Sequence, residues 1–319
     1  MFRQQLLKKI TSHLAATAIL LTAGIASILP GIANTSDAKI KFVSPEWVTR
    51  NINDPHLRIL DVRNVPLDFV AGHVPGAVNI ADANFRGPNG VLPVQYWDNQ
   101  RLEDLFRRAG VNNNSRVLVY SDGNDVLGAT SVAYLLERFG LKDISVLDGG
   151  YTAYYNSGAT VAQKYVDFKR GDFKIKDDPS IRVSVKQVEQ LTGKQGVEIV
   201  DPRPAPLFRG ETKIWTRNGH IPGATNIPWQ SFTQANNAEA EAKNPHKLKP
   251  LHEIRELLAK HNIKPTDNII ISCSTGREAT LQYTVLKHVL GYPNVRVYEG
   301  SWTEYSTTNL PVETGPGKQ

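Results

Sequence analysis

The chain of 319 residues contains the same sequence pattern twice. The first copy, "LRILDVRNVPLDFVAGHVPGAVNIA", begins at Leu57, and the second, "VEIVDPRPAPLFRGETKIWTRNGHIPGATNIPW", begins at Val197. Both read as an apolar run, then Asp-x-Arg, then Gly-His-Val/Ile-Pro-Gly-Ala. A further matching pair follows in the same order, starting with "RVLVYSDGND" at Arg116 and "NIIISCSTGREA" at Asn268. Such a repeat decides the architecture, because each copy folds as one unit. The sequence therefore predicts two homologous domains.

Each copy alternates short apolar runs with helical periodicity. "VEIVD" and "NIIIS" are too short for helices and are rich in Val and Ile, which is typical of strands buried on both faces of a parallel sheet. After "NIIIS", apolar residues recur at helical spacing, namely Leu281, Val285, Leu286, Val289 and Leu290. Gly291 follows these residues and is expected to end the helix. Strands alternating with helices predict α/β domains, each a mainly parallel sheet flanked by helices.

The repeat also sets the expected boundaries. We expect an N-terminal domain over residues 40–162 and a C-terminal domain over residues 181–319. Between them lies "QKYVDFKRGDFKIKDDPS", a charged segment with a proline, and we expect residues 163–180 to form a linker on the surface. The first 35 residues differ in composition from everything that follows.

Those first residues have the order of a secretory signal. Basic residues precede a stretch without charge over residues 14–33, and "NTSDAK" follows it. We expect a signal peptide over residues 1–35, cleaved near Ala33 or Ala38, and export to the periplasm. An uncleaved membrane anchor is the alternative, which Thr17, Thr22, Ser27 and Pro30 weaken. No second stretch approaches transmembrane length, so no stable membrane insertion is expected after cleavage.

The charge balance favours small anions as ligands. The formal net charge of +6 comes from 37 basic and 31 acidic residues, spread along the chain without a run of five like charges. A solvated basic surface suits anionic small molecules, and we expect no nucleic-acid binding.

The single cysteine, Cys273, stands at the end of a predicted strand and before a predicted helix. Ligands of open α/β sheets bind at the carboxyl ends of strands. Ser274, Thr275 and Gly276 are small enough for a tight curl that points backbone N–H groups inward, and Arg277 adds positive charge. This geometry is expected to lower the pKa of the thiol and to make it nucleophilic. The alternative is an inert buried cysteine.

The motifs "GHVPGA" and "GHIPGA", the loop "CSTGREA" and the ending "YEGSWTEY" resemble the tandem rhodanese family of sulfurtransferases over about residues 40–315. The resemblance implies two rhodanese-like domains, of which the first is catalytically silent, because Ser121 and Asp122 stand where the second has Cys273. It also implies a two-step reaction: Cys273 takes sulfur from a small anionic donor such as thiosulfate, then passes it from a persulfide to cyanide or a thiol. No metal or organic cofactor is expected.

The resemblance assigns further residues. Arg203 and Arg209 resemble arginines that face the anionic donor, with a surface or interdomain salt bridge as the alternative for each. Asp201 is expected to support the loop as a hydrogen-bond acceptor, and Trp302 either to wall the site or to pack the domain. His220, like its counterpart His73, is expected to be structural. The loop residues Ser274, Thr275, Gly276, Arg277 and Glu278 are expected to bind the donor.

The loop departs from familiar members of the family. It lacks the Arg-Lys that follows the cysteine in thiosulfate sulfurtransferases and the Gly-Ser-Gly-Val-Thr run of mercaptopyruvate enzymes. Arg277 and Glu278 stand where those proteins usually have Val and Thr, and Glu278 brings negative charge to an anion site unless Arg277 or the helix start neutralises it. Thiosulfate is the favoured donor and 3-mercaptopyruvate the second choice.

Two other functions compete with sulfur transfer. A cysteine phosphatase needs an arginine six positions after the cysteine, but position 279 is Ala and Arg277 comes four positions along. An exported carrier of sulfur, selenium or tellurium oxyanions, or a docking partner of a redox complex with little turnover, stays open.

Overall fold

The computed structural model describes residues 39–234 and 245–318. The expected signal peptide over residues 1–35 and its two candidate cleavage positions lie outside the described residues. Within the described ranges, no helix has both the length and the apolar character needed to cross a membrane.

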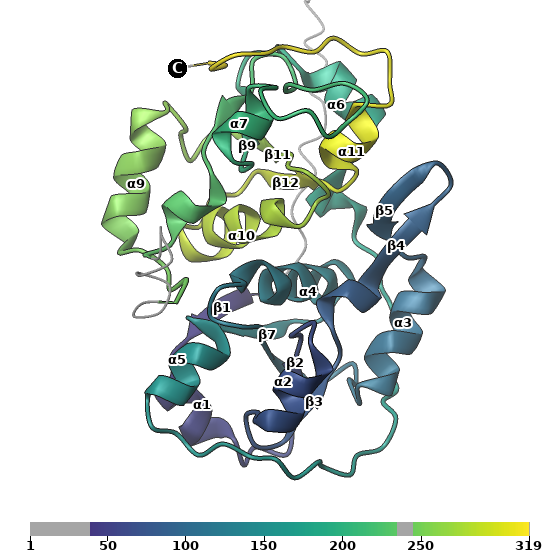
Figure 1. Ribbon diagram of the computed structural model, residues 1–319, viewed down its shortest axis with the longest axis vertical. Coiled ribbons are helices and arrows are strands. Elements are labelled where there is room, and N and C mark those ends of the chain that lie inside the picture. The colour runs from purple at the N-terminus through teal and green to yellow at the C-terminus, as the bar shows by residue number, and fades with distance from the viewer. Residues whose placement is uncertain (1–38, 235–244, 319) are drawn as a thin grey trace, which may run out of the picture. The chain divides into compact units, whose positions relative to one another are not determined.

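The first copy folds around a five-stranded parallel sheet with the strand order β1-β7-β6-β2-β3 (Figure 1). Its strands are β1 (Lys39–Val43), β2 (Leu57–Asp61), β3 (Ala77–Asn79), β6 (Arg116–Tyr120) and β7 (Asp143–Leu147). Its helices are α1 (Pro45–Asn51), α2 (Pro66–Ala71), α3 (Asn99–Arg108), α4 (Val126–Arg138) and α5 (Gly150–Asn156), with a 3₁₀ turn η1 (Asp82–Phe85).

The second copy forms its own five-stranded parallel sheet with the order β10-β9-β11-β12-β8. Its strands are β8 (Arg182–Val183), β9 (Val197–Asp201), β10 (Thr225–Asn226), β11 (Asn268–Ile271) and β12 (Val295–Tyr298). Its helices are α6 (Val185–Leu191), α7 (Ala205–Phe208), α9 (Leu251–Lys260), α10 (Glu278–Thr284) and α11 (Ser301–Tyr305), with 3₁₀ turns η2 (Pro179–Ile181) and η3 (Trp229–Phe232).

The two sheets have the same topology. In each, the first strand of the copy pairs with the last, and the strand that carries the Asp-x-Arg motif lies beside the strand that precedes the Ser121 or Cys273 loop. Ile269, Ile270 and Ile271 have no exposed surface, as expected for a strand covered on both faces. The prediction of two tandem α/β domains is confirmed.

The helix after the cysteine loop differs from its expected form. The α-helix α10 ends at Thr284, and a π-helical turn, η4 (Val285–Val289), continues it. The Leu290 N–H donates to the Val285 carbonyl oxygen, a hydrogen bond that spans five residues instead of four. Gly291 then adopts φ 77° and ends the helix, as the sequence predicts.

One element was not predicted. The segment between η1 and α3 forms an antiparallel hairpin of β4 (Arg86–Asn89) and β5 (Leu92–Tyr96), closed by Gly90 with φ 59°. It lies outside the repeated pattern, so comparison of the two copies gave no signal for it. The hairpin extends from the first domain to the side of α11 (Figure 1), and its register places Arg86 opposite Tyr96.

The segment between the domains contains no helix or strand over residues 163–178. It follows the first domain: the Gly171 N–H donates to the Arg107 carbonyl oxygen, and Phe173 is buried against Phe106. Both copies also tie their Gly-His turn to a later segment, because His73 pairs with Ala162 and His220 pairs with Glu313.

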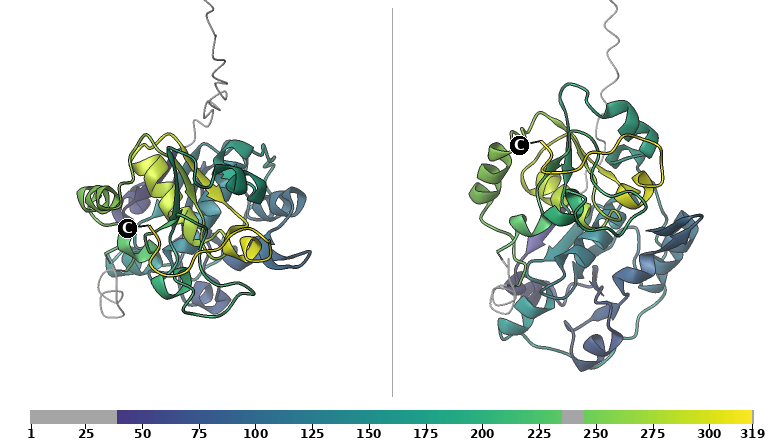
Figure 2. Two further views of the ribbon diagram at one scale, coloured as in Figure 1. Left: turned by 90° about the horizontal axis from the view of Figure 1, so that it is seen from above. Right: turned by 45° about the horizontal axis from the view of Figure 1, so that its top comes forward.

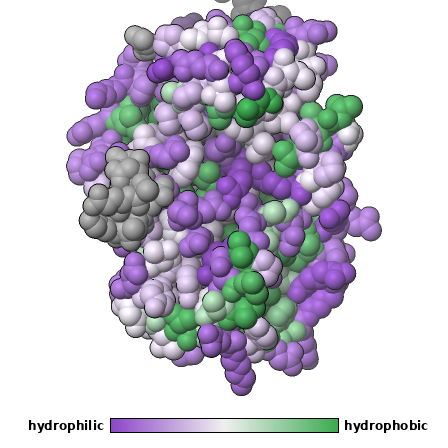
Figure 3. Space-filling model, in the orientation of Figure 1, coloured by the Kyte–Doolittle hydropathy of each residue, from purple (hydrophilic) through white to green (hydrophobic). Residues whose placement is uncertain are grey.

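The two domains pack through α4 and α10, and Figure 2 shows the two halves directly against each other. The Oγ1 atoms of Thr130 and Thr280 lie 3.0 Å apart, and the rings of Tyr134 and Tyr283 meet edge to face at 5.2 Å. All residues of α4 are buried. Figure 3 shows hydrophilic side chains across the middle of the face drawn. The exposed apolar residues Val65, Leu67 and Val70 lie in and beside α2. The helix that follows the cysteine loop is therefore held by the first domain.

Candidate active site

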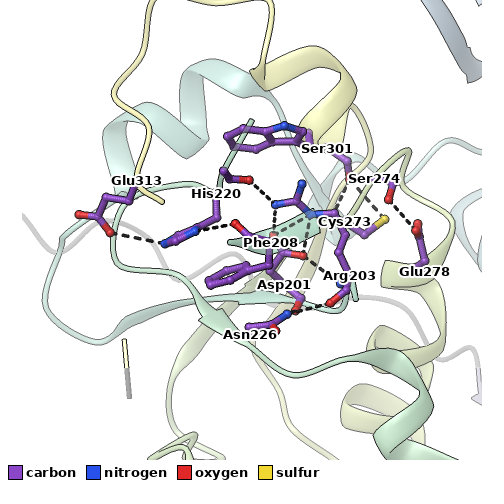
Figure 4. Close-up of polar contacts among 12 residues, drawn as sticks. Asp201, Arg203, Phe208, His220, Asn226, Cys273, Ser274, Glu278, Ser301 and Glu313 are labelled. Atoms are coloured by element: carbon purple, nitrogen blue, oxygen red, sulfur yellow. Dashed lines mark hydrogen bonds and ion pairs between the residues drawn. The ribbon is translucent and has the colours of Figure 1, made fainter. Parts of the chain in front are cut away.

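Cys273 follows β11 at the carboxyl end of the second sheet, and its side chain is fully buried (Figure 4). The backbone N–H of Gly276 donates to its Sγ over 3.1 Å, so the loop curls around the sulfur as the sequence predicts. Gly276 adopts φ 84°, and a Cβ there would lie 2.6 Å from the Glu299 carbonyl oxygen. Both the backbone conformation and the lack of space require glycine at this position.

Ser301 is a neighbour of the cysteine that sequence reasoning missed. It is a non-glycine residue with φ 49°, a conformation that costs about 1–3 kcal/mol and gathers at functional sites. Its Oγ accepts the Cys273 N–H at 3.0 Å, donates to the Tyr298 carbonyl oxygen at 2.7 Å and lies 3.6 Å from Sγ. The first copy has Gly150 there, with φ 59°. The sequence signal for Ser301 is the comparison of "DGGY" at residues 148–151 with "EGSW" at residues 299–302, where serine replaces glycine.

The pKa of the Cys273 thiol is raised, not lowered as the sequence led us to expect. Burial has the largest effect, because it disfavours the charged thiolate, and the neighbouring Glu278 carboxylate adds to it. The nearby Ser301 hydroxyl and the Ala279 backbone act in the opposite direction but do not outweigh these two effects. Both effects favour the protonated thiol over the thiolate.

Glu278, the first residue of α10, places its carboxyl group within the loop. Its Oε1 accepts a hydrogen bond from the Ser274 hydroxyl at 2.7 Å, which closes the loop over four residues (Figure 4). Its Oε2 is buried and has no hydrogen-bond partner in the described part of the chain. Arg277 does not neutralise it, because that side chain turns toward the first domain.

Arg277 is an interdomain clamp. Its Nε lies 2.6 Å from Asp82 and its Nη2 lies 2.7 Å from Asp125, and both carboxylates belong to the first domain. Burial alone lowers the pKa of Arg277, but the charges of Asp82 and Asp125 more than offset this and raise it. With its charge engaged by two carboxylates, Arg277 is not directed at a donor, nor could it clamp phosphate as in a phosphatase.

A second residue missed by the sequence reasoning, Arg86, reaches the same loop from the first domain. Its Nη1 lies 3.4 Å from Oγ1 and 3.5 Å from the carbonyl oxygen of Thr275, and its Nη2 donates to Ser131 Oγ at 2.8 Å. Its guanidinium stacks on the Tyr96 ring, 4.5 Å from the centroid. No pattern in the sequence connected a residue of the silent copy with the cysteine loop.

Asp201 and Arg203 form a buried pair within the second domain (Figure 4). Arg203 has no exposed surface, and its Nη2 donates to Asp201 at 2.6 Å and to the Gly219 carbonyl oxygen at 2.8 Å. Asp61 and Arg63 of the silent copy make the same contacts, with Gly72 in place of Gly219. The ion pair with Asp201 lies inside the second domain, so it is neither a surface nor an interdomain salt bridge. Nη1 of Arg203 is buried and has no hydrogen-bond partner in the described part of the chain, and the donor contact of Arg203 stays a prediction. The pair anchors the Gly-His turn.

The other two predicted residues lie apart from the sulfur or pack the domain. Arg209 is half-exposed, pairs with Glu211 and lines a separate pocket of about 380 Å³ with Lys260 and Lys318. Trp302 is buried, its Nε1 donates to the Arg217 carbonyl oxygen at 3.1 Å, and its backbone N–H donates to the Cys273 carbonyl oxygen. Of the two roles considered for Trp302, the geometry favours packing.

The Gly-His turns also match between copies. His220 Nδ1 donates to the Phe208 carbonyl oxygen at 2.9 Å and stacks on its ring (Figure 4), and His73 does the same with Phe69. Since the silent copy keeps the arrangement, it serves the fold.

Comparisons with known proteins show the family. The Rhodanese-like domain model matches residues 44–157 and again residues 184–308. The chain is 60% identical over 283 residues to a putative thiosulfate sulfurtransferase of Synechococcus elongatus, covering 89% of this chain and 88% of that protein. It is 29% identical to the 3-mercaptopyruvate sulfurtransferase of Escherichia coli, covering 85% of this chain and 97% of that protein.

The crystal structure of SseA, a 3-mercaptopyruvate sulfotransferase of Escherichia coli, superposes with a TM-score of 0.72 at 27% identity. The match covers 83% of this chain and 99% of SseA. The family model matches both domains, and the chain covers most of the length of these relatives. The second domain also has one thiol enclosed by a backbone loop, as expected for a sulfurtransferase. The chain belongs to the rhodanese-like family and is a sulfurtransferase with two tandem domains.

Proposed function

We propose that this protein transfers sulfane sulfur from thiosulfate to a thiophilic acceptor through a persulfide on Cys273. The observation that carries the proposal is the Gly276 N–H that points at Sγ from 3.1 Å, in a loop at the carboxyl end of the sheet. A backbone donor in that place stabilises negative charge on sulfur, whether on the thiolate or on the outer sulfur of a persulfide.

The reaction has two covalent steps. The thiol of Cys273 first loses its proton to solution, and the thiolate attacks the outer sulfur of thiosulfate. The S–S bond of the donor breaks, sulfite leaves with the electron pair, and Cys273 carries a persulfide. A cyanide ion or a thiolate then attacks the terminal sulfur, the persulfide bond breaks toward Cys273, and the thiolate is restored. Thiocyanate or a new persulfide is released.

The choice of thiosulfate rests on the Synechococcus relative at 60% identity. 3-Mercaptopyruvate is the second candidate, supported by the more distant Escherichia coli relative. Mass spectrometry of the intact protein after incubation with each donor tests both. We expect thiosulfate to add the mass of one sulfur atom, and Cys273→Ser to abolish the gain. Absence of an adduct with either donor contradicts the proposal. An adduct that does not turn over with cyanide or thiols favours a carrier or docking role in a redox system.

We also propose that the protein is exported to the periplasm, a proposal supported by the basic, apolar and polar order of residues 1–38. The test is N-terminal sequencing of protein recovered from the periplasmic fraction of the producing cell. A mature chain that begins at Asn34 or Lys39 supports cleavage after Ala33 or Ala38. Recovery of the chain only with its first residues intact in the membrane fraction favours the anchor.

A further inference from the structure

The cysteine loop has few positive groups available to an anionic donor. Arg277 is held by Asp82 and Asp125, and Arg203 is buried against Asp201. Arg209 lines a different pocket. Glu278 meanwhile places an unneutralised carboxylate beside the sulfur. A dianionic donor approaching a thiolate and a carboxylate is repelled unless another cation is present.

Arg86 is a cation at this loop that is not committed to a carboxylate. Its polar contacts go to neutral oxygens of Thr275 and Ser131, and no ion pair joins it to any residue within 39–234 and 245–318. Its Nε is buried without a hydrogen-bond partner. A guanidinium has five N–H donors, so Arg86 keeps unused donors as well as its full charge.

The hairpin fixes the position of this guanidinium. Arg86 and Tyr96 are directly opposite in the β4–β5 register, and the Tyr96 ring supports the guanidinium from one side. Tyr96 in turn donates to or accepts from Ser131 Oγ at 3.1 Å, which ties the stacked pair to α4. A guanidinium held flat in this way loses little freedom when it binds an oxyanion.

A cleft lies beside the Tyr96 ring on which Arg86 stacks. It has a volume of about 470 Å³ and lies between the hairpin and the second domain, with Tyr96, Trp97 and Glu299 among its lining residues. Glu299 is the residue whose carbonyl oxygen lies against Gly276 of the cysteine loop. Arg138 and Arg182 also line the cleft, but they pair with Glu299 and Asp177. Arg86 thus connects Tyr96, at the wall of the cleft, with Thr275 of the loop.

We propose that Arg86 is a specificity-determining residue that binds the anionic group of the sulfur donor, so that the silent domain supplies the donor-recognising charge. This inference rests on the proposed sulfur transfer. A sulfonate-like group takes two parallel N–H donors from a guanidinium, and the positive charge offsets the repulsion from Glu278.

The first experiment compares Arg86→Ala and Arg86→Lys with the wild type in thiosulfate-dependent turnover. Loss of a charge-assisted contact is expected to raise KM for thiosulfate about ten- to a hundredfold in Arg86→Ala, with a smaller change in kcat. Arg86→Lys is expected to fall between the two, because it keeps the charge without the fork. Arg101→Ala is the matched control, since Arg101 also stacks on an aromatic ring, that of Trp97, but makes no contact with the loop.

A second measurement separates anion recognition from a purely structural role. Cys273 is alkylated with iodoacetate, an anion, and with iodoacetamide, a neutral reagent of similar shape. We expect Arg86→Ala to lower the rate ratio of iodoacetate to iodoacetamide about tenfold, with the ratio unchanged in Arg101→Ala. An unchanged ratio, or equal slowing of both reagents, overturns the inference. If the wild type forms no persulfide from thiosulfate while the ratio still shifts, the proposed function fails and the anion contact stands.

Discussion

The loop at Ser121 in the first domain and the loop at Cys273 in the second occupy the same place in two copies of one sheet. The Tyr151 N–H donates to the Ser121 carbonyl oxygen, just as the Trp302 N–H donates to that of Cys273. The side chains differ: the Ser121 hydroxyl donates to the carbonyl oxygen of Asp125 in its own loop, whereas Cys273 Sγ receives the Gly276 N–H. The two loops share this backbone hydrogen bond, and the different side chains change what each loop can bind.

The first domain has no thiol in its loop, yet it contributes to the site in the other domain. Asp82 and Asp125 hold Arg277, and Arg86 reaches Thr275. Asp125 belongs to the very loop that corresponds to the cysteine loop. A domain without a thiol in its loop therefore places charged side chains against the cysteine loop of the other domain.

The largest effect is expected from exchanging the two loop residues. Cys273→Ser makes the second copy like the first and should reduce sulfur transfer to background, because no thiolate remains to attack the donor. Ser121→Cys in that background should not restore it, since the Gly123 N–H of that loop donates to the Asp122 side chain and the loop carries two acidic residues, Asp122 and Asp125. Thiocyanate formation is the measurement. Activity in the double variant would contradict the comparison.

Next in size is the interdomain clamp. Arg277→Leu leaves Asp82 and Asp125 facing each other without a cation, and breaking a largely buried ion pair costs about 3 kcal/mol of unfolding free energy. Urea denaturation followed by tryptophan fluorescence measures the loss. Replacing Asp82 by Asn in the same chain should recover part of it. A midpoint equal to that of the wild type would show that the clamp contributes nothing.

A smaller effect is expected from Glu278→Gln. The Glu278 carboxylate raises the pKa of Cys273, so its removal lowers that pKa, and the thiolate fraction at neutral pH rises. The rate of Cys273 alkylation by iodoacetamide at pH 7 should increase by up to about tenfold, and the pH profile of this rate should move to lower pH. Glu256→Gln, on the exposed face of α9, is the control. A profile that stays in place would mean that burial alone sets the pKa.

The smallest effect concerns Ser301, where the silent copy has Gly150. Ser301→Gly relieves a left-handed backbone but removes the hydroxyl that accepts the Cys273 N–H. These two changes oppose each other, so the unfolding free energy should change by about 1 kcal/mol or less. Sulfur transfer should fall more clearly, because the loop backbone loses its hydrogen-bond acceptor. Equal activity in the variant would show that this contact is not needed.

The sequence by itself determined the two α/β domains and the position of Cys273. Apolar runs, helical spacing and repeated turn motifs are local patterns, and each is interpreted without knowing what lies across the molecule. The requirement for glycine at position 276 also follows from a local curl. The repeat even predicted the structural role of His220, because His73 is the same residue in a copy without the chemistry.

The tertiary structure alone decided which charges face the sulfur. Arg277 is adjacent to the site in sequence but is paired with Asp82 and Asp125, while Arg86 is far away in sequence and lies at Thr275. Arg203 matched a binding motif but is buried with Asp201. Sequence gives the sign of a side chain's charge but not its partner, because the partner depends on how the chain packs in three dimensions, within a domain for Arg203 and between the domains for Arg277. Burial of Cys273 beside Glu278, which lies in the same loop, raises the pKa that the loop pattern alone suggested would be low.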